Sequence, residues 1–217
     1  MKGLLIKDAR LIWKQKRFLV ILLFLAIMLN FNSDGTFVIA YLSFIGFSFV
    51  LSTITYDETD NGYLFLMTLP VSRKMFAVEK YVFGLLLGSF TWTVGFFISI
   101  IFKLATEGEV SLFDFSVESL LLIPVFAVML SILLPFQFKF GSEKGRIAMF
   151  LAFAVAVVAA YLSAKGLKSI GIDLEQILDT LPAVHVALVD LFAFLTAAAA
   201  VAVSCAVSGR IMQNKEF

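Results

Sequence analysis

Long apolar runs alternate with short polar segments along the whole chain. A helix that crosses the hydrocarbon core of a bilayer needs about 20 mainly apolar residues, within a range of about 17–25. The runs therefore predict an all-α integral membrane protein with six transmembrane helices, over residues 18–31, 37–54, 81–102, 120–134, 147–162 and 181–207. We expect these helices to form one transmembrane domain over residues 1–217.

Two of these boundaries depend on single features. The first apolar run, Phe18–Leu29, is too short to span alone, so its helix must borrow preceding residues or continue to Phe31. Proline has no backbone N–H and disturbs the preceding turn of a helix, so we expect Pro135 to end the fourth helix.

The composition supports a membrane protein. Hydrophobic residues make up 61% of the chain and charged residues 15%, against about 45–50% and about 25% in soluble domains. The net charge of +1 gives no basic surface of the kind that binds nucleic acid. We therefore expect lipid as a partner and exclude nucleic acid.

The basic residues are distributed unevenly between the two predicted sides of the membrane. With a cytoplasmic N-terminus, only Lys103, Lys165 and Lys168 of the 17 Lys and Arg residues lie outside. Cytoplasmic loops carry the excess of Lys and Arg in membrane proteins. We therefore expect a protein of the plasma membrane with both termini in the cytoplasm.

The N-terminal segment before the first span combines apolar and basic side chains. We expect it to form an amphipathic helix, an elbow that lies in the membrane interface before the chain enters the bilayer. Trp13 would sit at the level of the headgroups, with Arg10 and Lys14 beside it. The alternative is that this segment is the charged cytoplasmic end of a longer first span.

Sequence motifs for catalysis and for nucleotide binding are absent. No G-x-x-x-x-G-K-[ST] occurs, so the chain has no P-loop. One His and one Cys are too few for a zinc or iron–sulfur site, and neither H-E-x-x-H nor G-x-S-x-G is present. We expect no catalytic residue, no metal and no cofactor in this chain.

The sixth apolar run contains two ionisable residues, His185 and Asp190. An Asp near the centre of a spanning helix costs about 2.5–3.5 kcal/mol on insertion scales and usually faces a cavity or a partner. We expect Asp190 to mark a substrate pathway or a dimer interface, with a structural hydrogen bond as its alternative role. His185 is a second candidate for the same site, although ordinary packing is the favoured role for this residue.

A small-residue pattern occurs in the third span. Gly84-x-x-x-Gly88 is of the kind that lets two helices approach closely. It predicts either packing within the chain or a contact between two chains.

The longest polar interruption, Tyr56–Lys80, separates the second span from the third. Asp60 or Asn61 can cap a short helix that begins with the next residue and ends before Pro70. Ser72 can then cap a second helix that leads into the third span. The short helix carries large apolar side chains, which would each gain about 1.5–3 kcal/mol by burial. We expect them to pack against the bundle, the headgroups or a partner.

The sequence DETDNGYLFLMTLPVSRKMFAVEKYV, residues 57–82, resembles the loop between the second and third spans of ABC-2 type transporter permeases. A phrase like NGY-x-F-L-x-TLPVSR-K recurs in the small six-span permeases of Gram-positive bacteria. The six-span layout is similar as well, as is the opening L-x-KD-x-R with Leu5, Lys7, Asp8 and Arg10. The nearest named members are the exporters of phenol-soluble modulins, which are amphipathic peptide toxins.

This resemblance implies a permease subunit of an ABC exporter with the type V fold. Two permease chains would pair as a homodimer, and each would hold a separate ATPase subunit that carries ATP and Mg²⁺. The loop after the second span of such permeases forms a coupling helix that sits in a cleft of the ATPase. The residues that match this motif are Asn61, Gly62, Tyr63, Leu64, Phe65, Met67, Leu69, Pro70, Arg73 and Lys74. The implied cargo is an amphipathic peptide or another hydrophobic compound.

Other functions remain open. A motor-free secondary transporter or channel would use Asp190, although such proteins usually carry more intramembrane charge and paired broken helices. A structural or immunity-type membrane protein is a further alternative. Only the motor-coupled permease requires the short cytoplasmic helix to dock on an ATPase.

Overall fold

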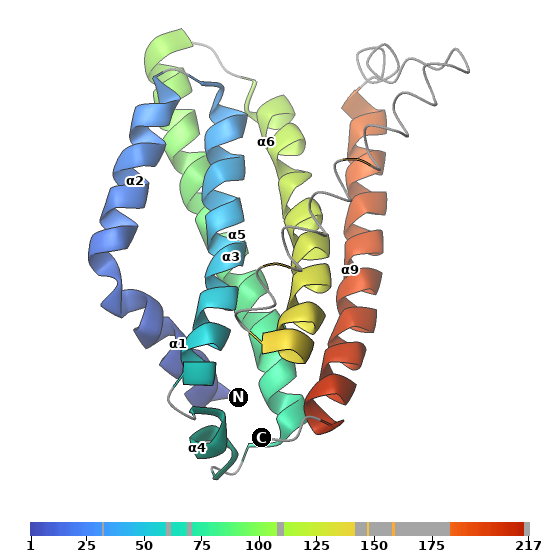
Figure 1. The fold of residues 1–217 in the computed structure, drawn as a ribbon. Coiled ribbons are helices and arrows are strands. Elements are labelled where there is room, and N and C mark those ends of the chain that lie inside the picture. The colour runs from blue at the N-terminus through green and yellow to red at the C-terminus, as the bar shows by residue number, and fades with distance from the viewer. Residues whose placement is uncertain are drawn as a thin grey trace.

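The apolar segments form helices that stand side by side (Figure 1). The computed structural model describes residues 1–31, 33–59, 62–68, 71–107, 111–141, 147, 158 and 183–214. These residues contain α1 (Lys2–Lys14), α2 (Lys16–Asn30), α3 (Gly35–Glu58), α4 (Gly62–Thr68), α5 (Arg73–Glu107), α6 (Leu112–Leu120), a helical stretch over residues 122–141, and α9 (Ala183–Asn214). Every regular element in this part of the chain is helical, which confirms the all-α prediction.

Four described helices are long and apolar enough to cross a membrane: Gly35–Glu58, Arg73–Thr106, Phe115–Gly141 and Leu188–Asn214. They correspond to the second, third, fourth and sixth predicted spans. The first predicted span overlaps α2, whose 15 residues extend about 22 Å at 1.5 Å per residue. This is shorter than a hydrocarbon core of about 30 Å, and α2 is not one of the four candidates. The fifth predicted span, 147–162, lies outside the described residues except for Ile147 and Val158.

The N-terminal segment forms its own helix. Gln15 separates α1 from α2 with φ −89° and ψ 25°, and α1 crosses the foot of the bundle while α2 rises away from it (Figure 1). On α1, Leu4, Asp8 and Ile12 are buried, a spacing of four that places them on one face of the helix. This geometry favours an elbow over a single continuous first span.

The prediction that Pro135 ends the fourth helix is wrong. Residues 122–141 remain helical through it. Pro135 cannot donate to the carbonyl of Ser131, four residues earlier, but the Ser204 hydroxyl on α9 donates to that carbonyl instead. A donor from a neighbouring helix replaces the missing backbone hydrogen bond, as membrane helices allow.

Glycines bring α3 and α5 close together. A Cβ at Gly88 would overlap the ring of Phe47, and one at Gly46 would overlap Thr91. A Cβ at Gly84 would lie 2.7 Å from Leu130 Cδ2 in the fourth helix. Of the two predicted roles of the glycine pattern, the structure therefore shows packing within the chain.

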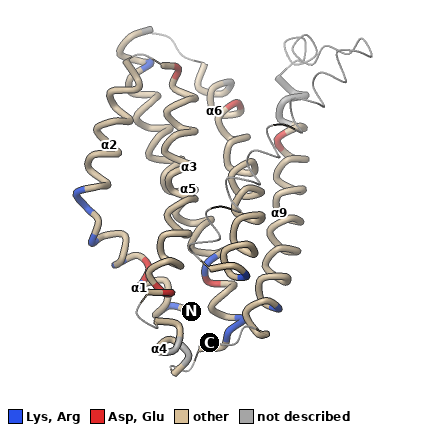
Figure 2. The backbone as a smooth tube through the Cα atoms, viewed as in Figure 1, with Lys and Arg blue, Asp and Glu red and all other residues tan. Residues whose placement is uncertain are grey.

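Both chain ends lie at the same end of the bundle as α4 (Figure 1). Arg73 at the start of α5 donates to the carbonyl of Gln213 over 2.9 Å, and the Met1 ammonium lies 3.8 Å from Met75 Sδ. Among the described Lys and Arg residues, Lys103 lies on the opposite part of α5, while most gather toward the end that holds the termini (Figure 2). The side of the membrane that this end faces stays a prediction.

Candidate coupling site and its buried ion network

The short predicted helix after α3 is present as α4, Gly62–Thr68. A Cβ at Gly62 would lie only 2.6 Å from the backbone oxygen of Asp57. Only glycine therefore lets the chain return this closely to the end of α3. Four residues of the prediction lie outside the described residues: the two candidate caps, Asp60 and Asn61, and Leu69 and Pro70 after the helix.

The faces of α4 differ in exposure. Tyr63 and Leu66 are each 6% exposed, whereas Phe65 is 69% exposed. The side chains of Leu64 and Met67 lie outside the described part. Among the predicted docking residues on this helix, Phe65 thus presents its ring outward, while Tyr63 packs into the bundle.

Tyr63 links α4 to α5. Its ring meets that of Phe76 edge to face, with centroids 5.6 Å apart and an interplanar angle of 83°. Its hydroxyl lies 3.5 Å from Glu58 Oε1. Burial, together with the negative charges of Glu58 and Asp57, raises the pKa of Tyr63, so the phenol stays protonated and can donate.

The predicted cap of the next helix is confirmed. Ser72 Oγ accepts a hydrogen bond from the backbone N–H of Met75 over 3.2 Å, and α5 begins at Arg73. This second helix is therefore continuous with the helix of the third predicted span. Arg73 is tied to α9 through Gln213, whereas Lys74 is exposed.

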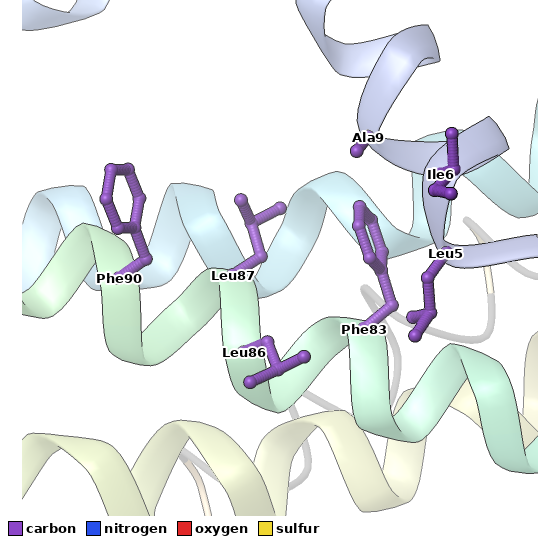
Figure 3. Close-up of a pocket in the computed structure, with 7 residues that line it drawn as sticks. All are labelled: Leu5, Ile6, Ala9, Phe83, Leu86, Leu87 and Phe90. Carbon is purple, nitrogen blue, oxygen red and sulfur yellow. The ribbon is translucent and has the colours of Figure 1, made fainter. Parts of the chain in front are cut away.

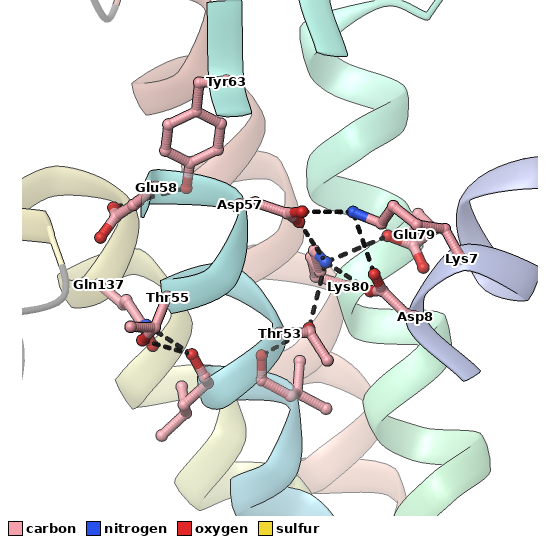
Figure 4. A network of polar contacts seen from close by, with 12 residues as sticks. Lys7, Asp8, Thr53, Thr55, Asp57, Glu58, Tyr63, Glu79, Lys80 and Gln137 are labelled. Carbon is pink, nitrogen blue, oxygen red and sulfur yellow. Dashed lines mark hydrogen bonds and ion pairs between the residues drawn. The ribbon is translucent and has the colours of Figure 1, made fainter. Parts of the chain in front are cut away.

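A buried ion network joins side chains of α1, α3 and α5 (Figure 4). Lys80 on α5 is 0% exposed, and its ammonium contacts Asp57 Oδ2 on α3 over 2.8 Å. The same ammonium pairs with Asp8 Oδ2 on α1 and donates to Thr53 Oγ1 over 3.1 Å. One cation therefore joins three helices.

Lys7 completes the network from the edge. Its ammonium lies 2.5 Å from Asp57 Oδ1 and 3.1 Å from Asp8 Oδ1. Burial alone would lower the pKa of Lys7, but the hydrogen bond and charge of Asp57, assisted by Asp8, outweigh it and raise this pKa. Lys7 is therefore a firmly charged member of the network.

Glu79 adds a third carboxylate to the two lysines. It is fully buried, and its Oε2 lies 3.9 Å from Lys80 Nζ, too far for a hydrogen bond. Within the described residues neither oxygen of Glu79 has a hydrogen-bond partner. Removing one member of a buried ion network is strongly destabilising, by about 3–5 kcal/mol, because the remaining charges lose their compensation.

The ring of Phe76 connects α4 with the network. Lys80 Nζ lies 5.1 Å and Lys7 Nζ 5.9 Å from its centroid, within the range of cation–π attraction. Tyr63 packs against the same ring. A displacement of α4 would thus act on the network through Phe76.

A second set of polar contacts connects α9 with α5 and with the helix over residues 122–141. The Tyr81 hydroxyl lies 2.5 Å from Ser204 Oγ and 2.8 Å from Ser208 Oγ, and Ser204 donates to the carbonyl of Ser131. Gln137 on the fourth helix donates to the carbonyl of Leu51 on α3 over 2.8 Å. The bundle is therefore cross-linked by polar contacts near its α4 end.

The other predicted site residues lie apart from this network. Asp190 is 5% exposed, and its Oδ1 has no hydrogen-bond partner within the described residues. It lies in the first third of α9, toward the end opposite α4 (Figure 1). His185 belongs to α9, but its side chain is not described. Trp13, Arg10 and Lys14 are exposed on α1.

Sequence reasoning missed the network, although a signal for it exists. Glu79 and Lys80 follow Phe76 by three and four residues, and they precede Phe83 by four and three residues. All four therefore share one helix face. Phe76 and Phe83 are buried, so two charged residues fall within an apolar stripe. Charges on a buried face require partners, which Asp8 and Asp57 supply for Lys80. In the part of the chain that the structure describes, no group of His, Cys, Asp and Glu could hold a metal ion.

Comparison with known families identifies the class of membrane protein to which this helical bundle belongs. Residues 3–213 match the model of a family described as ABC-2 family transporter protein. The chain therefore belongs to the ABC-2 transporter family and is a multi-pass membrane component of such a transporter. Members of the family lack ATPase domains and generally pair with an ABC ATPase. No curated protein and no solved structure matches the chain.

Proposed function

We propose that this chain is the membrane-spanning permease subunit of an ATP-driven ABC exporter, and that α4 engages a separate ATPase subunit. The observation that carries this proposal is Phe65, a large apolar ring that is 69% exposed on a short helix between two candidate spans. An exposed aromatic anchor beside polar residues is typical of residues that dominate protein–protein interfaces. The family of the chain supports an ABC ATPase as the partner.

The ion network gives α4 a rigid mounting in this proposal. Asp57 lies in the last turn of α3 and Lys80 in the first turns of α5, so their ion pair closes the loop that carries α4. A push on α4 would therefore move α3 and α5 together, and Asp8 would carry the movement to α1.

The wider assembly follows from the same proposal. Two permease chains pair as a homodimer in a bacterial plasma membrane, each with six spans and cytoplasmic termini, and the partner ATPase binds ATP and Mg²⁺. The concentration of basic residues near α4 supports a cytoplasmic position of that end. The proposed cargo is an amphipathic or hydrophobic peptide of the phenol-soluble modulin type, which the residues of the α4 loop suggest by resemblance.

Co-purification tests the docking step. The chain is extracted from its native cells in mild detergent, and the ATPase that accompanies it is quantified for the wild type and for Phe65→Glu. We expect the variant to lose the ATPase at least tenfold while the helical bundle remains folded. The matched control is Phe113→Glu on α6, which replaces a ring that is 66% exposed at the other end of the bundle and should retain the ATPase.

Retention of the ATPase by Phe65→Glu would show that α4 does not dock. Absence of any ATPase from the wild type, with transport lost in Asp190→Asn, would instead support a motor-free transporter.

A further inference from the structure

An apolar groove lies where α1 crosses α5 (Figure 3). It has a volume of about 380 Å³ and is lined by Leu5, Ile6, Ala9, Phe83, Leu86, Leu87 and Phe90. This volume falls within the range of about 300–1,000 Å³ that is typical of small-molecule sites. Its walls offer almost no polar group, so its occupant must be apolar where it lies in the groove.

The groove opens sideways rather than into the bundle. Ile6 is 53% exposed, Leu86 60% and Phe90 65%, so one wall faces the surroundings of the helices. From Phe83 to Phe90 the groove follows two turns of α5, about 10 Å at 1.5 Å per residue. This stretch belongs to a candidate membrane span, so an opening at this position suits an acyl chain of the bilayer.

Basic side chains occupy the same face of α1 as the groove. Lys2 precedes Ile6 by one turn and Arg10 follows it by one turn, which places all three on one side of the helix. Trp13 stands one turn after Ala9, and its ring is 74% exposed. Tryptophan at such a position prefers the level of the lipid headgroups.

No described residue neutralises the exposed charges on this face of α1. Asp8 is the one acidic residue before Asp34, and it is fully buried in the ion network. Lys2 and Arg10 are exposed, and neither takes part in an ion pair with any residue that the structure describes. In the described part of the chain, Lys2 and Arg10 therefore stand as unpaired cations beside the mouth of an apolar groove.

We propose that the groove between α1 and α5 is a binding site for an anionic phospholipid. One acyl chain lies along Phe83, Leu87 and Phe90, and the phosphate is held by Lys2 and Arg10. Cations next to a membrane surface attract anionic lipids by about 1 kcal/mol each, or about fivefold in affinity. The inference does not depend on the proposed coupling to an ATPase.

Quenching of Trp13 fluorescence by brominated lipid tests the proposal. The full chain carries Trp92→Phe, which leaves Trp13 as the single tryptophan, and is reconstituted in equimolar phosphatidylglycerol and phosphatidylcholine. One lipid at a time is brominated on its acyl chains. We expect phosphatidylglycerol to be enriched at Trp13 at least fivefold over phosphatidylcholine.

Two variants separate the parts of the site. Lys2→Gln/Arg10→Gln should reduce the enrichment to less than twofold, and Ala9→Phe, which fills the groove, should reduce it as well. The matched control, Lys16→Gln/Arg17→Gln, removes the same charge from the start of α2, away from the groove, and should retain the enrichment.

Equal quenching by both lipids in the wild type would overturn the proposal, as would equal losses in the test and control variants. Equal quenching by both lipids, together with protection of Trp13 from this quenching by an added amphipathic peptide, would assign the groove to a peptide instead.

Discussion

Lys80 on α5 and Asp57 on α3 form an ion pair of 2.8 Å that closes the loop carrying α4. Both residues are nearly or fully buried, so the pair belongs to the interior of the protein. Replacement of Lys80 by Met should lower the free energy of unfolding by about 3–5 kcal/mol, because Asp8 and Asp57 lose their shared cation.

The double variant Lys80→Met/Asp57→Asn should be more stable than the single variant, since it removes one of the stranded charges. Denaturant titration in detergent measures both. Equal stability of Lys80→Met and the wild type would contradict the buried network.

Ser204 and Pro135 offer a test of the substituted hydrogen bond. Ser204→Ala leaves the carbonyl of Ser131 without a donor, because Pro135 supplies none. The variant should lose about 1–3 kcal/mol of stability, the usual cost of an unsatisfied buried acceptor.

In Pro135→Ala the backbone N–H returns, so the same Ser204→Ala change should have a smaller effect. A thermodynamic cycle over the four proteins gives the coupling between the two positions. Additive effects would show that the Ser204 hydroxyl does not replace the missing donor.

Gly88 tests the contact between α3 and α5. A methyl group at this position would overlap the ring of Phe47, so Gly88→Ala should destabilise the bundle by about 1–3 kcal/mol, the range for overpacking. Gly3→Ala on α1 is the control, because no atom lies within 4 Å of its added Cβ. Thermal unfolding of both variants should separate them clearly, and a similar transition temperature would refute the close approach.

The raised pKa of Tyr63 predicts that the stability of the protein depends on pH in the alkaline range. The pKa of Tyr63 is raised in the folded protein above its ordinary value of about 10. The unfolded chain therefore loses this proton first as the pH rises, and stability falls above about pH 10, by up to about 1.4 kcal/mol per pH unit. Below that pH this group causes no change.

Tyr63→Phe keeps the ring against Phe76 and removes the ionisable group. It should lose less stability than the wild type between pH 9 and pH 11, as measured by denaturant titration at each pH. Lys7, whose pKa is also raised, is present in both proteins, so the difference isolates Tyr63. Parallel curves for the two proteins would exclude this role.

Local signals in the sequence predicted much of this fold. Ser72 marks the start of α5, and the α4 loop begins its helix at Gly62, because caps and close turns depend on neighbouring residues. The prediction from Pro135 was wrong because it rested on a local rule, whereas the replacement donor is distant in sequence. Ser204, which supplies that donor, is 73 residues from the accepting Ser131. Contacts of that range leave no mark in a local pattern.

The candidate site also contains residues that local sequence signals indicate and residues whose contacts are distant in sequence. Phe65 and its loop stand out as apolar residues in a polar segment. The network of Lys80 with Asp8 and Asp57 depends on three helices meeting, and separations of 72 residues in sequence cannot be predicted from spacing on one helix. The charged pair within the apolar stripe of α5 indicates that partners exist but does not identify them.

The ion network also has a consequence for how the protein is made. Asp8 is synthesised 72 residues before Lys80, an interval of about 4–14 s at about 5–20 residues per second. Until α5 has been synthesised, Asp8 on α1 lacks its ion-pair partner Lys80. The contact of α1 with α5 through Asp8 and Lys80 therefore forms only after α5 has been made, although α1 precedes α5 along the chain.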